Sequence, residues 1–95
     1  MTKEKIVLCG KGREAEEAAS WAEARARAAR RSRRAALAYG QRVRHAYEEA
    51  CHVLVTGASE QPSIQISVDR QDLSTTIELM DAQGRPKRGQ LLTGS

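Results

Sequence analysis

The chain has 95 residues and a formal net charge of +4, and its large apolar side chains are few, with no phenylalanine, one tryptophan and two tyrosines. This length predicts one domain whose core is near the lower limit of independent stability, which favours oligomerisation. No apolar run approaches the roughly 20 residues of a membrane span, and the start of the chain lacks a signal-peptide pattern. Cys9 and Cys51 are too few for a disulfide framework, so a reducing compartment is expected.

Charge is divided unevenly along the chain. Residues 24–45 contain eight arginines and no acid, whereas residues 46–83 contain seven acids and one base, Arg70. Such segregation predicts a surface that contacts either a polyanion or the acidic region of another protein, including a second copy. The candidate contact residues are Arg25, Arg27, Arg30, Arg31, Arg33, Arg34, Arg42 and Arg44.

Residues 1–12 are predicted to form a short strand and a turn. The apolar run Lys5–Cys9 suits a strand, and Gly10–Ala15 fits the G-x-G-x-x-A pattern of dinucleotide sites. That pattern needs a second parallel strand soon after the helix, and no strand pattern recurs before residue 63. A plain strand-to-helix turn is therefore favoured, and no cofactor or small-molecule substrate is expected.

Residues 13–56 are predicted to form one long basic helix, because alanine, glutamate and arginine dominate and proline is absent until Pro62. Gly40 is the position where this helix is expected either to kink or to divide in two. The second half carries an apolar stripe typical of a helix that packs on a core: Ala36, Tyr39, Val43, Ala46, Tyr47, Ala50 and Leu54. The first half offers mainly alanine, so it is expected to project or to contact another subunit.

Residues 63–80 are predicted to form an antiparallel hairpin. Apolar and polar residues alternate through two runs, and Arg70 and Asp72 lie in the short turn between them. A lone hairpin is marginal, so its apolar face should lie on the helix stripe. Residues 81–95 lack periodicity and are predicted to be a flexible basic arm that contacts a partner through Arg85, Lys87 and Arg88. The expected fold class is α+β: a short strand, a long helix and a C-terminal hairpin.

Two patterns resemble reactive sites. One helix carries four potential metal ligands at spacings used by carboxylate-bridged metal centres: His45, Glu48, Glu49 and His52. Such centres need two copies of a Glu-x-x-His unit, and this chain has one, Glu49 and His52. Surface pairs Arg44–Glu48 and His45–Glu49 are favoured instead, and no metal is expected. Cys9 and Cys51 are interpreted as small buried residues, and the absence of a nucleophile–base pattern predicts a protein that is not an enzyme.

The segment from Ser63 to Asp81, SIQISVDRQDLSTTIELMD, resembles small head-to-tail connector and tail-completion proteins of siphophages that infect actinobacteria. In that family an alanine-rich helix precedes such a hairpin, with an aspartate near the turn that Asp72 matches. The resemblance covers about residues 35–81. It implies a structural subunit of a ring at the virion neck, located in the virion or the host cytoplasm.

Three functions are therefore considered. The first is a structural assembly protein, a homo-oligomer among other virion proteins, with possible DNA contact and no membrane contact. The second is a nonspecific nucleic-acid-binding protein that uses the arginine-rich helix. The third is a small phage-encoded inhibitor of a host protein, whose acidic residues 46–83 would mimic nucleic acid.

Overall fold

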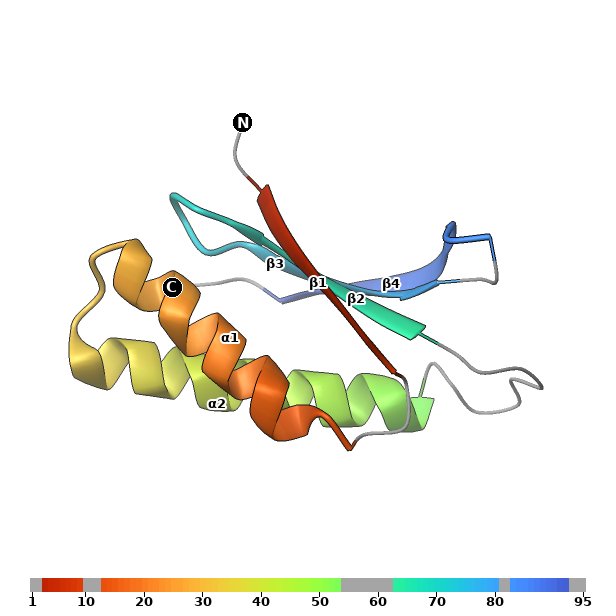
Figure 1. Ribbon diagram of the computed structural model, residues 1–95, viewed down its shortest axis with the longest axis horizontal. Coiled ribbons are helices and arrows are strands. Elements are labelled where there is room, and N and C mark those ends of the chain that lie inside the picture. The colour runs from red at the N-terminus through yellow and green to blue at the C-terminus, as the bar shows by residue number, and fades with distance from the viewer. Residues whose placement is uncertain (1–2, 10–12, 54–62, 81–82, 93–95) are drawn as a thin grey trace.

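The computed structural model describes residues 3–9, 13–53, 63–80 and 83–92. The elements follow in the order β1 (Lys3–Cys9), α1 (Ala15–Ala28), α2 (Arg33–Val53), β2 (Ser63–Asp69), β3 (Thr75–Met80) and β4 (Pro86–Leu92). All neighbouring strands are antiparallel, and the sheet order is β1-β2-β3-β4. The two helices pack together and cover one face of the sheet (Figure 1). The predicted α+β class is confirmed.

The predicted hairpin is formed by β2 and β3, with Ile66 opposite Ile77. The alternation places Ile66, Ile77 and their apolar neighbours in the core against α2. Side chains close the turn: the Asp69 carboxylate accepts the N–H of Gln71 at 2.8 Å, and the Asp72 carboxylate accepts the N–H of Ser74 at 2.8 Å. The hydrogen bond from the Ser74 backbone lowers the pKa of Asp72.

The prediction of one helix over residues 13–56 with a kink at Gly40 is wrong, because the helix breaks at residues 29–32 and α2 continues through Gly40. The break is a Schellman motif: Arg30 takes the left-handed conformation (φ 64°), its N–H bonds the Arg27 carbonyl, and the Arg31 N–H bonds the Ala26 carbonyl. Ser32 then caps α2 by accepting the Ala35 N–H at 3.2 Å. The predicted helix end near Thr56 lies outside the described residues.

Two effects explain the break. Arginines three and four residues apart without intervening acids destabilise a continuous helix. Folding back also buries the alanine face of α1 against α2, which the expectation of a projecting first half did not foresee. The buried alanines of α1 are Ala15, Ala18, Ala22 and Ala26. Small side chains let the two backbones approach closely.

Gly40 lies at one of these close approaches. A Cβ built at Gly40 would lie 3.0 Å from the Ala19 carbonyl oxygen and 3.4 Å from the Glu23 Cβ. The glycine therefore serves helix packing, and the expectation of a kink at this position is replaced by a contact between α1 and α2.

The prediction that residues 81–95 form a flexible arm is wrong for residues 86–92, which form β4 and pair with β3. Gly84 (φ 79°) forms the preceding turn, and Pro86 begins the strand, a position where its missing N–H is tolerated. No alternation announces this strand, because the sequence PKRGQLL carries charges and a glycine where an apolar face would be expected. Arg85 is exposed, whereas the side chains of Lys87 and Arg88 lie outside the described set.

Two buried tyrosines fasten α2 to the sheet. The Thr75 hydroxyl donates to the Leu73 carbonyl at 2.9 Å, so the Tyr39 hydroxyl donates to Thr75 Oγ1. Tyr47 donates to the backbone carbonyl of Cys9 at the end of β1. These bonds satisfy polar groups inside a core that contains few large side chains.

We expect both tyrosines to ionise only above the ordinary tyrosine pKa of about 10. Burial raises the pKa of Tyr39 and of Tyr47 in the folded state. The tyrosine contribution to stability is therefore complete below pH ~10 and is lost as the pH rises further, by up to about 1.4 kcal/mol per pH unit for each tyrosine. Tyrosinate absorbance followed together with unfolding tests this, with Tyr39→Phe and Tyr47→Phe as controls. Native-state ionisation of both groups near pH ~10 would contradict it.

Candidate anion-binding surface

The eight arginines of residues 24–45 do not form one surface. Arg25 pairs with Glu4 at 3.3 Å, Arg27 with Glu23 at 3.8 Å, and Arg44 with Glu16 at 2.9 Å. Arg42 also interacts within the chain. Half of the predicted polyanion contacts are therefore engaged internally.

The other four are concentrated where α1 meets α2. We call this cluster the arginine turn; it consists of Arg30, Arg31, Arg33 and Arg34. None of the four has an ion pair within the part of the chain that the structure describes. Three of their side chains are exposed, and Arg31 is half-buried.

The local structure gathers these side chains around the start of a helix. Arg30 and Arg31 follow the last turn of α1, and Arg33 and Arg34 are the first two residues of α2. The first N–H groups of a helix have no acceptor within that helix. Ser32 accepts the N–H of Ala35, and this leaves the N–H groups of Arg33 and Arg34 without a partner within the helix. The positive end of the α2 dipole therefore adds to the four guanidinium charges, and the surface attracts anions.

The hairpin turn lies at the same end of the molecule as the arginine turn (Figure 1). The charge of Arg31 is a minor cause of the lowered pKa of Asp72, after the Ser74 hydrogen bonds. Arg70, also predicted as a turn residue, extends to the N-terminal strand, where its Nε donates to the Glu4 carboxylate at 3.1 Å. The predicted turn residues Arg70 and Asp72 thus border the arginine turn without belonging to it.

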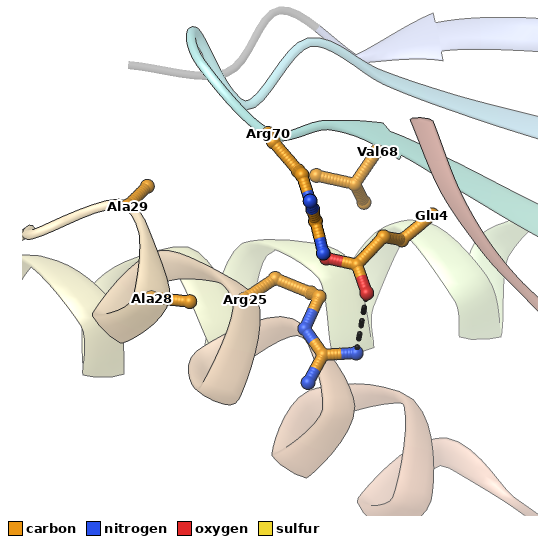
Figure 2. A pocket seen from close by; sticks show the side chains of 6 residues that line it. All are labelled: Glu4, Arg25, Ala28, Ala29, Val68 and Arg70. Atoms are coloured by element: carbon orange, nitrogen blue, oxygen red, sulfur yellow. Dashed lines mark hydrogen bonds and ion pairs between the residues drawn. The ribbon is translucent and has the colours of Figure 1, made fainter. Parts of the chain in front are cut away.

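A cavity of about 340 Å³ lies beside this end of the molecule, lined by Glu4, Arg25, Ala28, Ala29, Val68 and Arg70. Figure 2 shows Arg25 and Arg70 converging on the carboxylate of Glu4. Arg25 also stacks over Trp21, 5.5 Å from its ring centroid. The Glu4 carboxylate thereby joins β1, α1 and the hairpin turn, and it offsets one of the two guanidinium charges.

The acidic residues that the structure describes lie at more than one place in the fold. Asp69 and Asp72 lie in the hairpin turn near the arginine turn, whereas Glu48 and Glu49 lie toward the opposite end of α2. The contact between Arg44 and Glu16 places Glu48 and Glu49 beside the start of α1, with its Glu16 and Glu17. Of the acids on which the hypothesis of a nucleic-acid mimic depends, these four described ones are divided between two ends of the molecule, and Glu60 and Asp81 lie outside the described residues.

The other predicted patterns have simpler outcomes. No group of three potential metal ligands converges in the described part of the chain. Arg44 lies 4.0 Å from Glu48 as predicted, but His45 approaches Glu48 at 3.7 Å rather than Glu49. Cys9 and Cys51 are free thiols and half-buried rather than buried. The glycines of the G-x-G-x-x-A pattern lie outside the described residues.

Sequence reasoning missed Ser32 and Glu4. Ser32 carried a usable signal, because serine is a preferred helix N-cap and begins a run that suits a new helix. Glu4 carried none: its two partners lie 21 and 66 residues away along the chain. Only the tertiary fold brings them together.

No protein-family model, curated protein or solved structure matches this chain. Neither helix in the described residues has both the length and the apolar character that a membrane span requires.

Proposed function

We propose that the protein is a non-enzymatic structural subunit that assembles with copies of itself, as a component of a virion neck between head and tail. The observation that carries this proposal is the open sheet: β1 and β4 are its two edge strands. An edge strand presents backbone N–H and C=O groups to a further strand. Within the described residues, neither outer edge is paired.

The geometry of the edges favours a ring. Pairing β1 of one copy with β4 of the next is a head-to-tail contact, because the two surfaces differ. Such contacts close into rings when the rotation between copies permits closure. The resemblance of Ser63–Asp81 to neck proteins supports the same assembly, since this segment lies in the hairpin at the centre of the sheet.

Val7 marks the β1 edge as a contact. It is 58% exposed and is one of two exposed large apolar side chains in the described residues. It lies on the sheet face opposite the helices, between Lys5 and Cys9. The other is Leu37, 46% exposed on α2. Lysine on an edge strand discourages pairing with another strand. β1 already carries Lys3 and Lys5 near its start, so a further lysine at position 7 should weaken the proposed contact more.

Sedimentation of the nuclease-treated full chain tests the proposal. We expect a discrete oligomer, and we expect Val7→Lys to weaken association by at least roughly tenfold, the equivalent of about 1.4 kcal/mol. Leu37→Lys is the matched control, since it introduces the same charge at an exposed apolar residue away from the sheet edges, and it should leave the oligomer intact. A monomer at all concentrations, or equal effects of both variants, would overturn the proposal.

A further inference from the structure

We propose that the arginine turn binds the phosphate backbone of duplex DNA without reading its sequence. This inference deepens the proposed function, on which it rests, by naming the polyanion that the subunit contacts in its particle. It assigns the contact to Arg30, Arg31, Arg33 and Arg34, and it leaves the four engaged arginines outside the interface.

The first argument is that these arginines occupy positions that oppose local stability. Arg30 has the left-handed conformation, which is unfavourable for a residue with a Cβ and which glycine adopts freely. Arg33 and Arg34 lie in the first turn of α2, where the helix dipole disfavours positively charged side chains. The first turn of α2 contains no acid. These arginines lower the stability of the fold, and we infer that they are present because they bind an anionic partner.

The second argument is charge density. Four arginines that form no ion pair with the described part of the chain lie within five consecutive residues, so the partner must present several closely spaced anions. Duplex DNA carries one negative charge per roughly 1.7 Å of its axis and presents such an array along its whole length. The helix N-terminus at the same place offers two N–H groups to a phosphate oxygen.

The third argument is that the acidic end of the helix pair in another copy of the chain is a poorer partner. At the opposite end of the helix pair, Glu16 and Glu48 are engaged with Arg44, and Glu14 accepts the Cys9 N–H. Among the described residues of that end, Glu17 and Glu49 are exposed glutamates without an ion pair. Two carboxylates do not match four guanidinium groups and a helix N-terminus.

The geometry also indicates the mode of binding. The contact surface is a turn and the beginning of a helix, rather than a helix face that could enter the major groove. Backbone contact alone predicts affinity that is independent of sequence. Four phosphate contacts predict that the logarithm of affinity falls with the logarithm of salt concentration with a slope of about −3.6.

Fluorescence anisotropy with a short duplex DNA at several salt concentrations is the test, using the full chain. Arg33→Glu combined with Arg34→Glu should weaken binding by at least roughly a hundredfold, about tenfold for each contact. The same change should leave the unfolding midpoint unchanged or higher, because acids suit a helix N-terminus. Loss of binding therefore cannot be attributed to unfolding.

A matched pair of single variants sharpens the test. Arg30→Gly should raise the unfolding midpoint, weaken binding and reduce the salt slope by about 1. Arg13→Gly removes the same charge from an exposed residue at the far end of α1 and should change neither binding nor slope. Equal effects of both variants would mean that net charge alone governs binding, and would overturn the assignment.

Two further outcomes are informative. Failure of the unmodified protein to bind at low salt would overturn the inference, as would loss of self-association, rather than of DNA binding, in the Arg33→Glu and Arg34→Glu variant. The latter would assign the arginine turn to an acidic protein surface. Failure of the proposed assembly can be distinguished from failure of this inference. The Val7→Lys variant should lose self-association but should still bind DNA as a monomer.

Discussion

Replacing Gly40 with valine is expected to destabilise the protein by about 1–3 kcal/mol, the range observed when methyl groups are forced into a packed interior. The physical reason is the close approach of the two helices. The new Cβ would lie 3.0 Å from the Ala19 carbonyl oxygen, a backbone atom that moves only with its helix. Valine is otherwise a slightly better helix former than glycine, so the loss would come from α1 being pushed away. Chemical denaturation measures the effect.

Ala38→Val is the matched control for this substitution. Ala38 lies two residues earlier on the same helix with its side chain exposed, so only the lower helix propensity of valine should appear, at most about 0.6 kcal/mol. A neutral Gly40→Val variant would contradict the described packing of α1 on α2. That result would restore the alternative in which α1 projects from the core.

The parts of the fold that depend on local periodicity were predictable. Alternation in β2 and β3 fixed which residues face the core, because side chains of a strand alternate between its two faces. The stripe on α2 did the same, and Tyr39, Val43 and Tyr47 are buried as expected. Such periodic patterns are local, so a short stretch of sequence is enough to identify the element and the face that it buries.

The parts of the fold that depend on contacts between residues far apart in the sequence were not predictable. The helix break at Arg30 lacks the glycine that usually marks a left-handed helix end, and its energy comes from burying alanines of α1 against α2. The strand β4 has no apolar alternation, and pairing with β3 is what organises it. The arginines could be counted from the sequence, but their division into engaged and unengaged groups depends on partners such as Glu4 and Glu16.

The arginine turn connects these observations. A continuous helix would have spread the eight arginines along a rod, whereas the break concentrates four of them at one end of the molecule. The same break lets α1 fold back, so that its alanine face packs against α2. One change of backbone conformation thus completes the core and creates the candidate site.

Ile66→Ala is expected to destabilise the protein by about 2–5 kcal/mol, the usual cost of truncating a fully buried isoleucine. Ile66 is completely buried on β2, where it pairs with Ile6 on one side and Ile77 on the other. A domain of this size has a total stability of about 5–15 kcal/mol, and its alanine-rich helices contribute little apolar area. The loss should therefore consume a large share of the stability, which thermal and chemical unfolding would both report.

Gln65→Ala provides the comparison, because this neighbouring side chain is half-exposed on the opposite face of the sheet, and its replacement should cost less than about 1 kcal/mol. Ile66→Val should lie between the two, at about 0.5–1.5 kcal/mol. If Ile66→Ala and Gln65→Ala were equivalent, the sheet would not present this face to the helices. DNA binding by the folded fraction of Ile66→Ala should remain unchanged, since the core holds the arginine turn in place but does not contact phosphate.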